Sequence, residues 1–317
     1  MVTSKSTGPD GGSHTLRLPE TMMQASSALE SVLARDRTVV ITGLVTVIVL
    51  AWIYILLGPG TGMTAFEMTT MSMPGTPSAM EMTGDSRGMS SRKSMGGPMR
   101  MAHSAMMQPA VWTPSYAALM FLMWWIMMVA MMVPSASPMM LLFARIQRQQ
   151  QEKGSPVVPT SVFTAGYLVT WGAFSVIAAG AQWGFERAGL LSAMMTSTSG
   201  LFAGVLLLAA GIYQLTPLKH ACLRHCRSPI QFITQHWRHG AGGALRMGIG
   251  HGAFCLACCW LLMALLLVGG VMNLYWIVGL ALFVLLEKTI PAGHWLGAIT
   301  GIGLVIWGGW LMAGTVW

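Results

Sequence analysis

The chain has 317 residues, of which 54% are hydrophobic and only 9% are charged. Soluble domains carry about 25% charged residues, so a soluble protein of this composition would expose a large apolar surface. The net charge of +8 does not indicate nucleic-acid binding, because the basic residues fall between apolar runs and form no patch interleaved with aromatic residues. Composition therefore predicts an all-α protein that crosses the lipid bilayer several times, a polytopic transmembrane helical bundle.

Seven apolar runs are each long enough to cross about 30 Å of hydrocarbon as a helix. The charged, polar stretch before the first run does not resemble a cleavable signal peptide, so that run predicts a membrane anchor. In chain order the seven predicted spans are 38–57, 113–133, 161–181, 200–217, 247–270, 274–290 and 295–314.

The distribution of lysine and arginine among the short connecting segments predicts orientation. They are frequent in 1–37, 134–160 and 218–246, and scarce in 182–199 and 271–273. The segment 58–112 holds four basic residues and argues against the same orientation, but the rule weakens in so long a segment. The pattern predicts an N-in, C-out arrangement in a bacterial inner membrane. The predicted organisation is a cytoplasmic tail over 1–37, a first transmembrane helix over 38–57, a periplasmic loop over 58–112 and a six-helix metal-binding membrane domain over 113–314.

The predicted loop over 58–112 is rich in methionine. Twelve methionines lie between Met63 and Met107, among Gly, Ser, Thr and Pro residues that predict disorder. Thioether sulfur is a soft, neutral ligand that suits Cu(I) or Ag(I) much better than hard cations. The loop therefore predicts capture of a soft metal, with a flexible linker as the alternative.

A second methionine feature follows in the span 113–133. One helical turn separates the sulfurs of its two MxxxM pairs, a spacing that suits the passage of a soft cation from site to site. The alternative is packing, because methionine commonly fills gaps in apolar helices. Pro134 and Pro138 predict that this helix ends or kinks. The methionine ladder comprises Met120, Met123, Met127, Met128, Met131 and Met132.

All five cysteines fall in two short clusters. In the first, Cys222 and Cys226 are four residues apart, with His220 and His225 adjacent, at the start of a predicted basic inner loop. Thiolate and imidazole together can hold Cu(I) or Zn(II). The alternative is a pair of free thiols in a reducing cytosol.

The second cluster lies in the stretch HGAFCLACCW, inside an apolar run. On a helix, His251, Cys255, Cys258 and Cys259 share one face. This predicts metal ligation, with packing or C-x-x-C redox chemistry as alternatives. The spacing leaves open whether the two cysteine clusters form one site or a relay.

Four motifs in order resemble a bacterial family of predicted metal-binding integral membrane proteins. The resemblance covers roughly 111–313 and implies metal binding at the cysteines and His251 named above. The methionine-rich loop and the MxxxM pairs are also similar in chemistry to eukaryotic high-affinity copper importers, which have a different fold. The motifs are WWIMMVAMMVPSASPM, YQLTPLKHACLRHCRSP, HGAFCLACCWLLM and EKTIPAG.

Together these features predict a membrane protein that binds Cu(I), with zinc as a second possible metal, and moves or delivers it across the inner membrane. Its expected partners are the lipid bilayer, the metal ion and a copper chaperone or cuproenzyme. We do not expect an enzyme. The alternatives are a non-transporting copper chaperone or assembly factor, a membrane thiol–disulfide oxidoreductase, and a structural subunit in which Met and Cys only pack.

Overall fold

A computed structural model describes residues 20–58, 64–66, 69, 111–152, 158–192 and 195–314, with side chains from Thr38 onward. Its named elements are all α-helices, and one isolated antiparallel bridge joins Leu191 to Ser197. The prediction of an all-α fold is confirmed for these residues. Most of the methionine-rich segment 58–112, predicted to be a periplasmic loop, lies outside the described residues.

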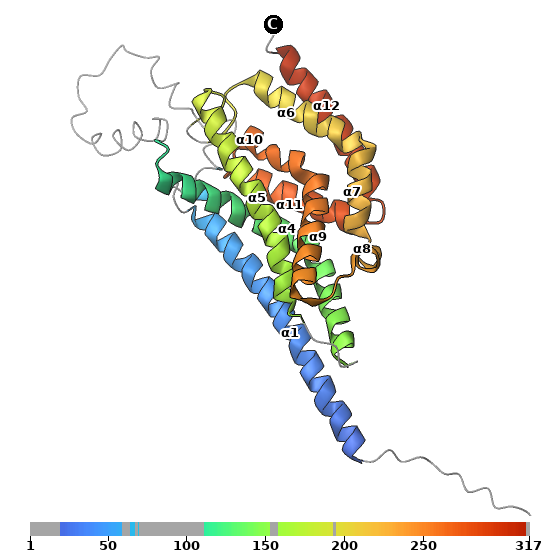
Figure 1. The fold of residues 1–317 in the computed structure, drawn as a ribbon. Helices are drawn as coiled ribbons and strands as arrows, with labels where there is room; N and C mark the ends of the chain where they lie inside the picture. The colour runs from blue at the N-terminus through green and yellow to red at the C-terminus, as the bar shows by residue number, and fades with distance from the viewer. Residues whose placement is uncertain are drawn as a thin grey trace, which may run out of the picture.

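The helices follow one another, with short connections from Gly200 onward (Figure 1). They are α1 (Glu20–Leu57), α4 (Pro114–Glu152), α5 (Thr160–Arg187), α6 (Gly200–Leu215), α7 (Pro217–Arg227), α8 (Pro229–His236), α9 (Gly240–Ala264), α10 (Leu266–Gly269), α11 (Leu274–Thr289) and α12 (Gly293–Gly314).

The helices α5 and α9 run side by side through the middle of the molecule (Figure 1). On one side, α4 packs against α5 and carries α1 on its outer face; on the other, α7 packs against α9. The pair α6 and α12 packs together beside this core, and α11 contacts α4. The faces of α4, α5, α7, α9 and α11 therefore converge on a common interior.

Two glycines let α5 and α9 approach closely. A Cβ atom on Gly166 would overlap the backbone carbonyl of Leu245, and one on Gly248 would overlap that of Phe163. Small residues at such crossings are typical of helices that pack within a membrane. The contact fixes the depth at which residues of α9 face residues of α5.

The surface is apolar and the interior contains polar side chains. Ile177 and Trp310 are 69% and 72% exposed, whereas Gln182 and Lys219 are 0% and 1% exposed. A soluble protein rarely leaves so much apolar surface uncovered. The arrangement fits a lipid-facing exterior around a functional interior.

Among the residues that the structure describes, five helices are long and apolar enough to cross a membrane, or six if α6 and α7 count as one bent span. The apolar part of α1, Thr38–Leu57, coincides with the predicted first span. The predicted sixth span, 274–290, forms α11, which has 16 residues and a length of about 24 Å. That is shorter than about 30 Å of hydrocarbon. A multi-span helical protein is therefore supported, but the count of seven is not confirmed.

The structure refines two local expectations. Helix α4 passes through Pro134 and Pro138 and has 39 residues in all, so of the predicted end or kink, an end at these prolines is excluded. Next to the second proline, the Ser137 hydroxyl donates to the Val133 carbonyl at 2.9 Å, a bond back to the preceding turn that serines often make inside helices. The predicted inner loop 218–246 contains α7 and α8, because Thr216 caps α7 and a proline starts each helix.

Candidate metal centre

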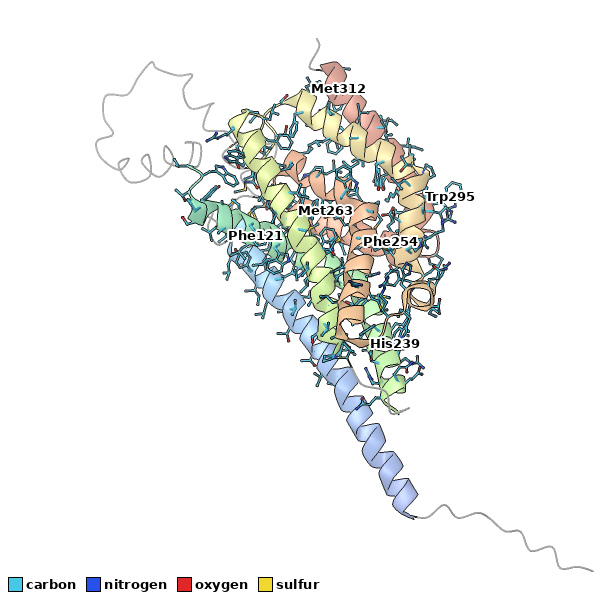
Figure 2. All side chains as sticks on the ribbon, in the orientation of Figure 1. Phe121, His239, Phe254, Met263, Trp295 and Met312 are labelled. Atoms are coloured by element: carbon cyan, nitrogen blue, oxygen red, sulfur yellow. The ribbon has the colours of Figure 1, made fainter. Side chains whose placement is uncertain are left out.

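Helix α9 places its histidine and cysteines on the face that points into the molecule. Cys255, Cys258 and Cys259 are each 1% exposed, and His251 is 3% exposed. The shared face predicted from helical spacing is therefore present and buried. Figure 2 marks Phe254 and Met263 on the same helix, with Phe254 beside α7.

Helix α7 brings the first cysteine cluster to the second. The chain bends by 66° between α6 and α7, and the Thr216 hydroxyl accepts a hydrogen bond from the Lys219 backbone N–H at 3.4 Å. The half-buried Cys226 then lies close enough to Cys255 and Cys258 for their thiols to interact. The two cysteine clusters are therefore neighbours in the fold.

We call the set Cys226, Cys255, Cys258, Cys259 and Met132 the sulfur centre. Met132, at the end of the methionine ladder on α4, has its Sδ 3.9 Å from Cys259 Sγ. All six ladder methionines are at most 2% exposed. The inner end of the buried ladder on α4 thus contacts the cysteines of α9 through Met132 and Cys259.

Two polar contacts hold α7 against the end of α11. Lys219 forms a buried ion pair with Glu287. The Arg227 guanidinium donates to the backbone carbonyls of Ile290 and of Pro291, the latter at 2.6 Å. Consecutive helical residues point in different directions, so Glu287 pairs with Lys219 across the helix interface and not with the adjacent Lys288.

Lys288, the residue after Glu287, takes no part in this ion pair and points into the sulfur centre. Its Nζ lies 3.0 Å from Cys255 Sγ and 3.2 Å from Ser135 Oγ. The hydroxyl of Tyr167, which is 0% exposed, lies 3.1 Å from the same sulfur and donates to the Met132 carbonyl at 3.2 Å. An ammonium group and a phenol therefore surround Cys255.

Sequence reasoning missed Lys288 and Tyr167 as parts of this centre. A lysine at the end of an apolar run was a usable signal, since ionisable groups at membrane depth are functional candidates. Tyr167 gave no signal of its own, because a single tyrosine in the apolar run of α5 looks like any packing aromatic.

The three predicted histidines have different environments. His251 has no hydrogen-bond partner for its buried Nδ1 and packs against Phe232 at 5.4 Å between ring centroids. His225 uses its Nδ1 on the Ala221 carbonyl at 2.9 Å and stacks on Phe254 at 4.4 Å. Of these two, only His251 has a buried ring nitrogen left for another partner.

His220 lies elsewhere on α7. It is partly buried, and the basic residues near it include Lys219 and, at the start of α12, His294. Cys222, one turn before Cys226, is also partly buried and lies in the neighbourhood of Cys258. His220 and Cys222 therefore lie beside the sulfur centre.

The thiols are arranged for hydrogen bonding. Cys258 Sγ and Cys259 Sγ both donate to the Cys255 carbonyl, at 3.0 and 2.9 Å. Within the described ranges no group of three or more His, Cys, Asp or Glu side chains has the geometry to hold a metal ion as it stands. Metal ligation would require these thiols to leave the carbonyl by rotation about χ1, which stays within the staggered rotamers of cysteine.

The fold and this centre define a class: a multi-helix protein with apolar spans and a buried site of soft sulfur donors. The family model PpoB2, described as "Copper chaperone", matches residues 121–311, which include α5 to α11 and all of the sulfur centre. The chain therefore belongs to this copper chaperone family. The predicted resemblance to a metal-binding membrane family is confirmed. Searches of curated proteins and of solved structures each gave no match.

Proposed function

We propose that this protein holds Cu(I) at the sulfur centre within a bacterial inner membrane and hands it to a copper-requiring acceptor. The observation that carries the proposal is the packing of α7 against α9, which brings the thiol of Cys226 close to those of Cys255 and Cys258. Thiolate and thioether ligands favour Cu(I), and donors already gathered by the fold need only side-chain rotation to bind it. Membership in a copper chaperone family supports the same metal.

The ammonium of Lys288 favours a monovalent metal ion at the sulfur centre. Two thiolates around Cu(I) carry a single net negative charge, which the ammonium 3.0 Å from Cys255 would balance. Two thiolates around Zn(II) are neutral, so the same ammonium would remain uncompensated in an apolar interior. Zinc remains the second candidate metal and would need a third thiolate for charge balance.

The methionine ladder supports a feeding role. Neutral thioethers bind Cu(I) without adding charge, so we expect them to hold it more weakly than the thiolates do. The contact between Met132 and Cys259 gives the ion a route from α4 into the centre without contact with water. In this proposal the methionine-rich segment 58–112 collects copper and the ladder passes it to the cysteines.

The deciding experiment measures metal content after purification in detergent under reducing conditions and loading with Cu(I). We expect near-stoichiometric copper in the wild type, little in Cys226→Ser, and little in the triple variant at positions 255, 258 and 259. Cys222→Ser is the matched control on α7 and should retain most of the copper. Copper-free wild-type protein after loading would refute the proposal, and zinc in place of copper would remove the role given to the ladder.

Transport across the membrane is the second candidate function, favoured by the continuity of the ladder with the sulfur centre. It predicts Cu(I) flux into proteoliposomes, whereas a chaperone that does not transport predicts transfer only to an added acceptor protein. A thiol oxidoreductase, the enzyme alternative, predicts a Cys255–Cys258 disulfide that cycles during turnover. It also predicts no effect of replacing ladder methionines with leucine.

A further inference from the structure

At the opposite end of the methionine ladder, a polar network surrounds the first sulfur. The Gln182 amide, 0% exposed, donates from Nε2 to Met120 Sδ at 3.7 Å and to Glu186 Oε1 at 2.8 Å. Its Oε1 accepts from the Trp124 indole N–H at 2.8 Å. The other carboxylate oxygen of Glu186 accepts from the Trp112 indole N–H at 2.7 Å.

Glu186 lies at the boundary between this network and a pocket of about 770 Å³. The pocket is lined by the start of α4 and the end of α5, including Trp112, Phe121 and Trp183; Figure 2 marks Phe121 on this end of α4. Arg187 also lines it, with its guanidinium 4.8 Å from the centre of the Trp183 ring. Gln182 and Met120 do not line the pocket. Glu186 does, and its hydrogen bond to Gln182 connects the pocket with the first methionine of the ladder.

The amide of Gln182 occupies the position that a cation would take. Its N–H groups donate to the Glu186 carboxylate and to the Met120 thioether, the negative group and the electron-rich group at this end of the ladder. A carboxylate lowers the cost of removing a cation from water, and the thioether selects a soft one. Because every partner is satisfied without an ion, the position favours brief occupancy over storage.

We propose that Glu186, Gln182 and Met120 form an entry site for a soft monovalent cation, in which the ion replaces the Gln182 amide N–H groups between carboxylate and thioether. The proposal rests on the function proposed above and adds the step that precedes the ladder. The carboxylate attracts the ion from the pocket, and the thioether then receives it. The site therefore controls the rate of loading and leaves the amount bound at equilibrium unchanged.

The test uses Ag(I), supplied as its nitrate in chloride-free buffer, as a soft monovalent probe that needs no reductant. Full-length protein in detergent is mixed with Ag(I) in a stopped-flow instrument, and silver–thiolate bonds are followed by ultraviolet absorbance. We expect Glu186→Gln to load about tenfold more slowly than the wild type, with the same final amplitude. Added salt should slow the wild type and leave Glu186→Gln almost unaffected, because screening acts on the carboxylate charge.

Two variants separate charge from structure. Glu186→Asp keeps the carboxylate and should load at close to the wild-type rate. Trp112→Phe removes one hydrogen-bond donor to the same carboxylate but keeps its charge, and should also load quickly. Equal loading rates in wild type and Glu186→Gln, or equally slow loading in all three variants, would overturn the entry site. Absence of any silver–thiolate signal in the wild type would instead refute the function on which it rests.

Discussion

The methionine ladder and the sulfur centre meet at Met132, but their electrostatic surroundings differ. Ladder methionines such as Met127 and Met131 are completely buried among apolar residues. In the sulfur centre, Cys255 has an ammonium at 3.0 Å and a phenol at 3.1 Å. Neutral sulfur without charged neighbours suits weak, exchangeable binding, whereas thiols beside a fixed cation suit a stable anionic complex. Under the proposed function, sulfur would therefore pass the ion along α4 and retain it on α9.

The largest expected difference is in equilibrium affinity. Cys255→Ser removes a charged ligand from the centre and should lower Cu(I) affinity by about a hundredfold or more, as loss of a metal ligand exceeds the 10- to 100-fold effect of outer-shell changes. Met131→Leu removes one neutral sulfur and should change the Cu(I) affinity by less than about threefold. Competition with a Cu(I) chelator of known affinity measures both. Equal losses in the two variants would remove the distinction between the regions.

The second prediction concerns the helix pair that supports the centre. Gly248→Ala places a methyl group against the Phe163 carbonyl and should cost about 1–3 kcal/mol of folding stability. Gly250→Ala, on the same helix, meets only Phe232 Cζ at 3.8 Å and should be neutral or slightly stabilising. Thermal or denaturant unfolding in detergent compares them. A neutral Gly248→Ala would show that α5 and α9 can separate without loss.

The third prediction tests the charge of the centre. Lys288→Met keeps much of the side-chain volume and removes the ammonium that contacts Cys255. We expect Cu(I) affinity to fall about tenfold while Zn(II) affinity is unchanged or rises, because the anionic Cu(I) complex loses its counter-charge. Paired titrations with the two metals give the ratio. Lys219→Met is a poor control, since it leaves Glu287 buried without its partner.

Periodicity and composition predicted much of this molecule from the sequence. Helical spacing placed His251 and the three cysteines of α9 on one buried face, because their face is a local property of one helix. Local patterns could not predict that α7 turns by 66° and delivers Cys226 to that face. Nor could they assign Glu287 to Lys219, since the partner comes from a helix 68 residues away in the chain.

Sequence patterns also missed site residues whose partners lie on another helix. Gln182, Glu186 and Tyr167 lie on α5, where each looks like an isolated polar residue in or beside an apolar run. Their roles depend on partners that come close only once the helices pack: Trp124 and Met132 of α4, and Trp112 just before it. Tertiary contacts, absent from any single-helix pattern, decide which polar residues are functional.

The smallest expected effect comes from shortening the ladder without touching its ends. Met127→Leu/Met131→Leu removes two buried sulfurs and conserves side-chain volume, so folding stability should change by less than about 1.5 kcal/mol. If thioethers pass the ion inward, loading of the cysteines should slow a few-fold in the Ag(I) stopped-flow assay, with the final amplitude unchanged. Leu207→Met/Leu262→Met, a pair of similar buried exchanges elsewhere, controls for repacking. An unchanged rate would reduce the ladder to packing and leave copper to reach α9 by another route, whereas a slower rate at constant amplitude would assign passage to α4 and retention to α9.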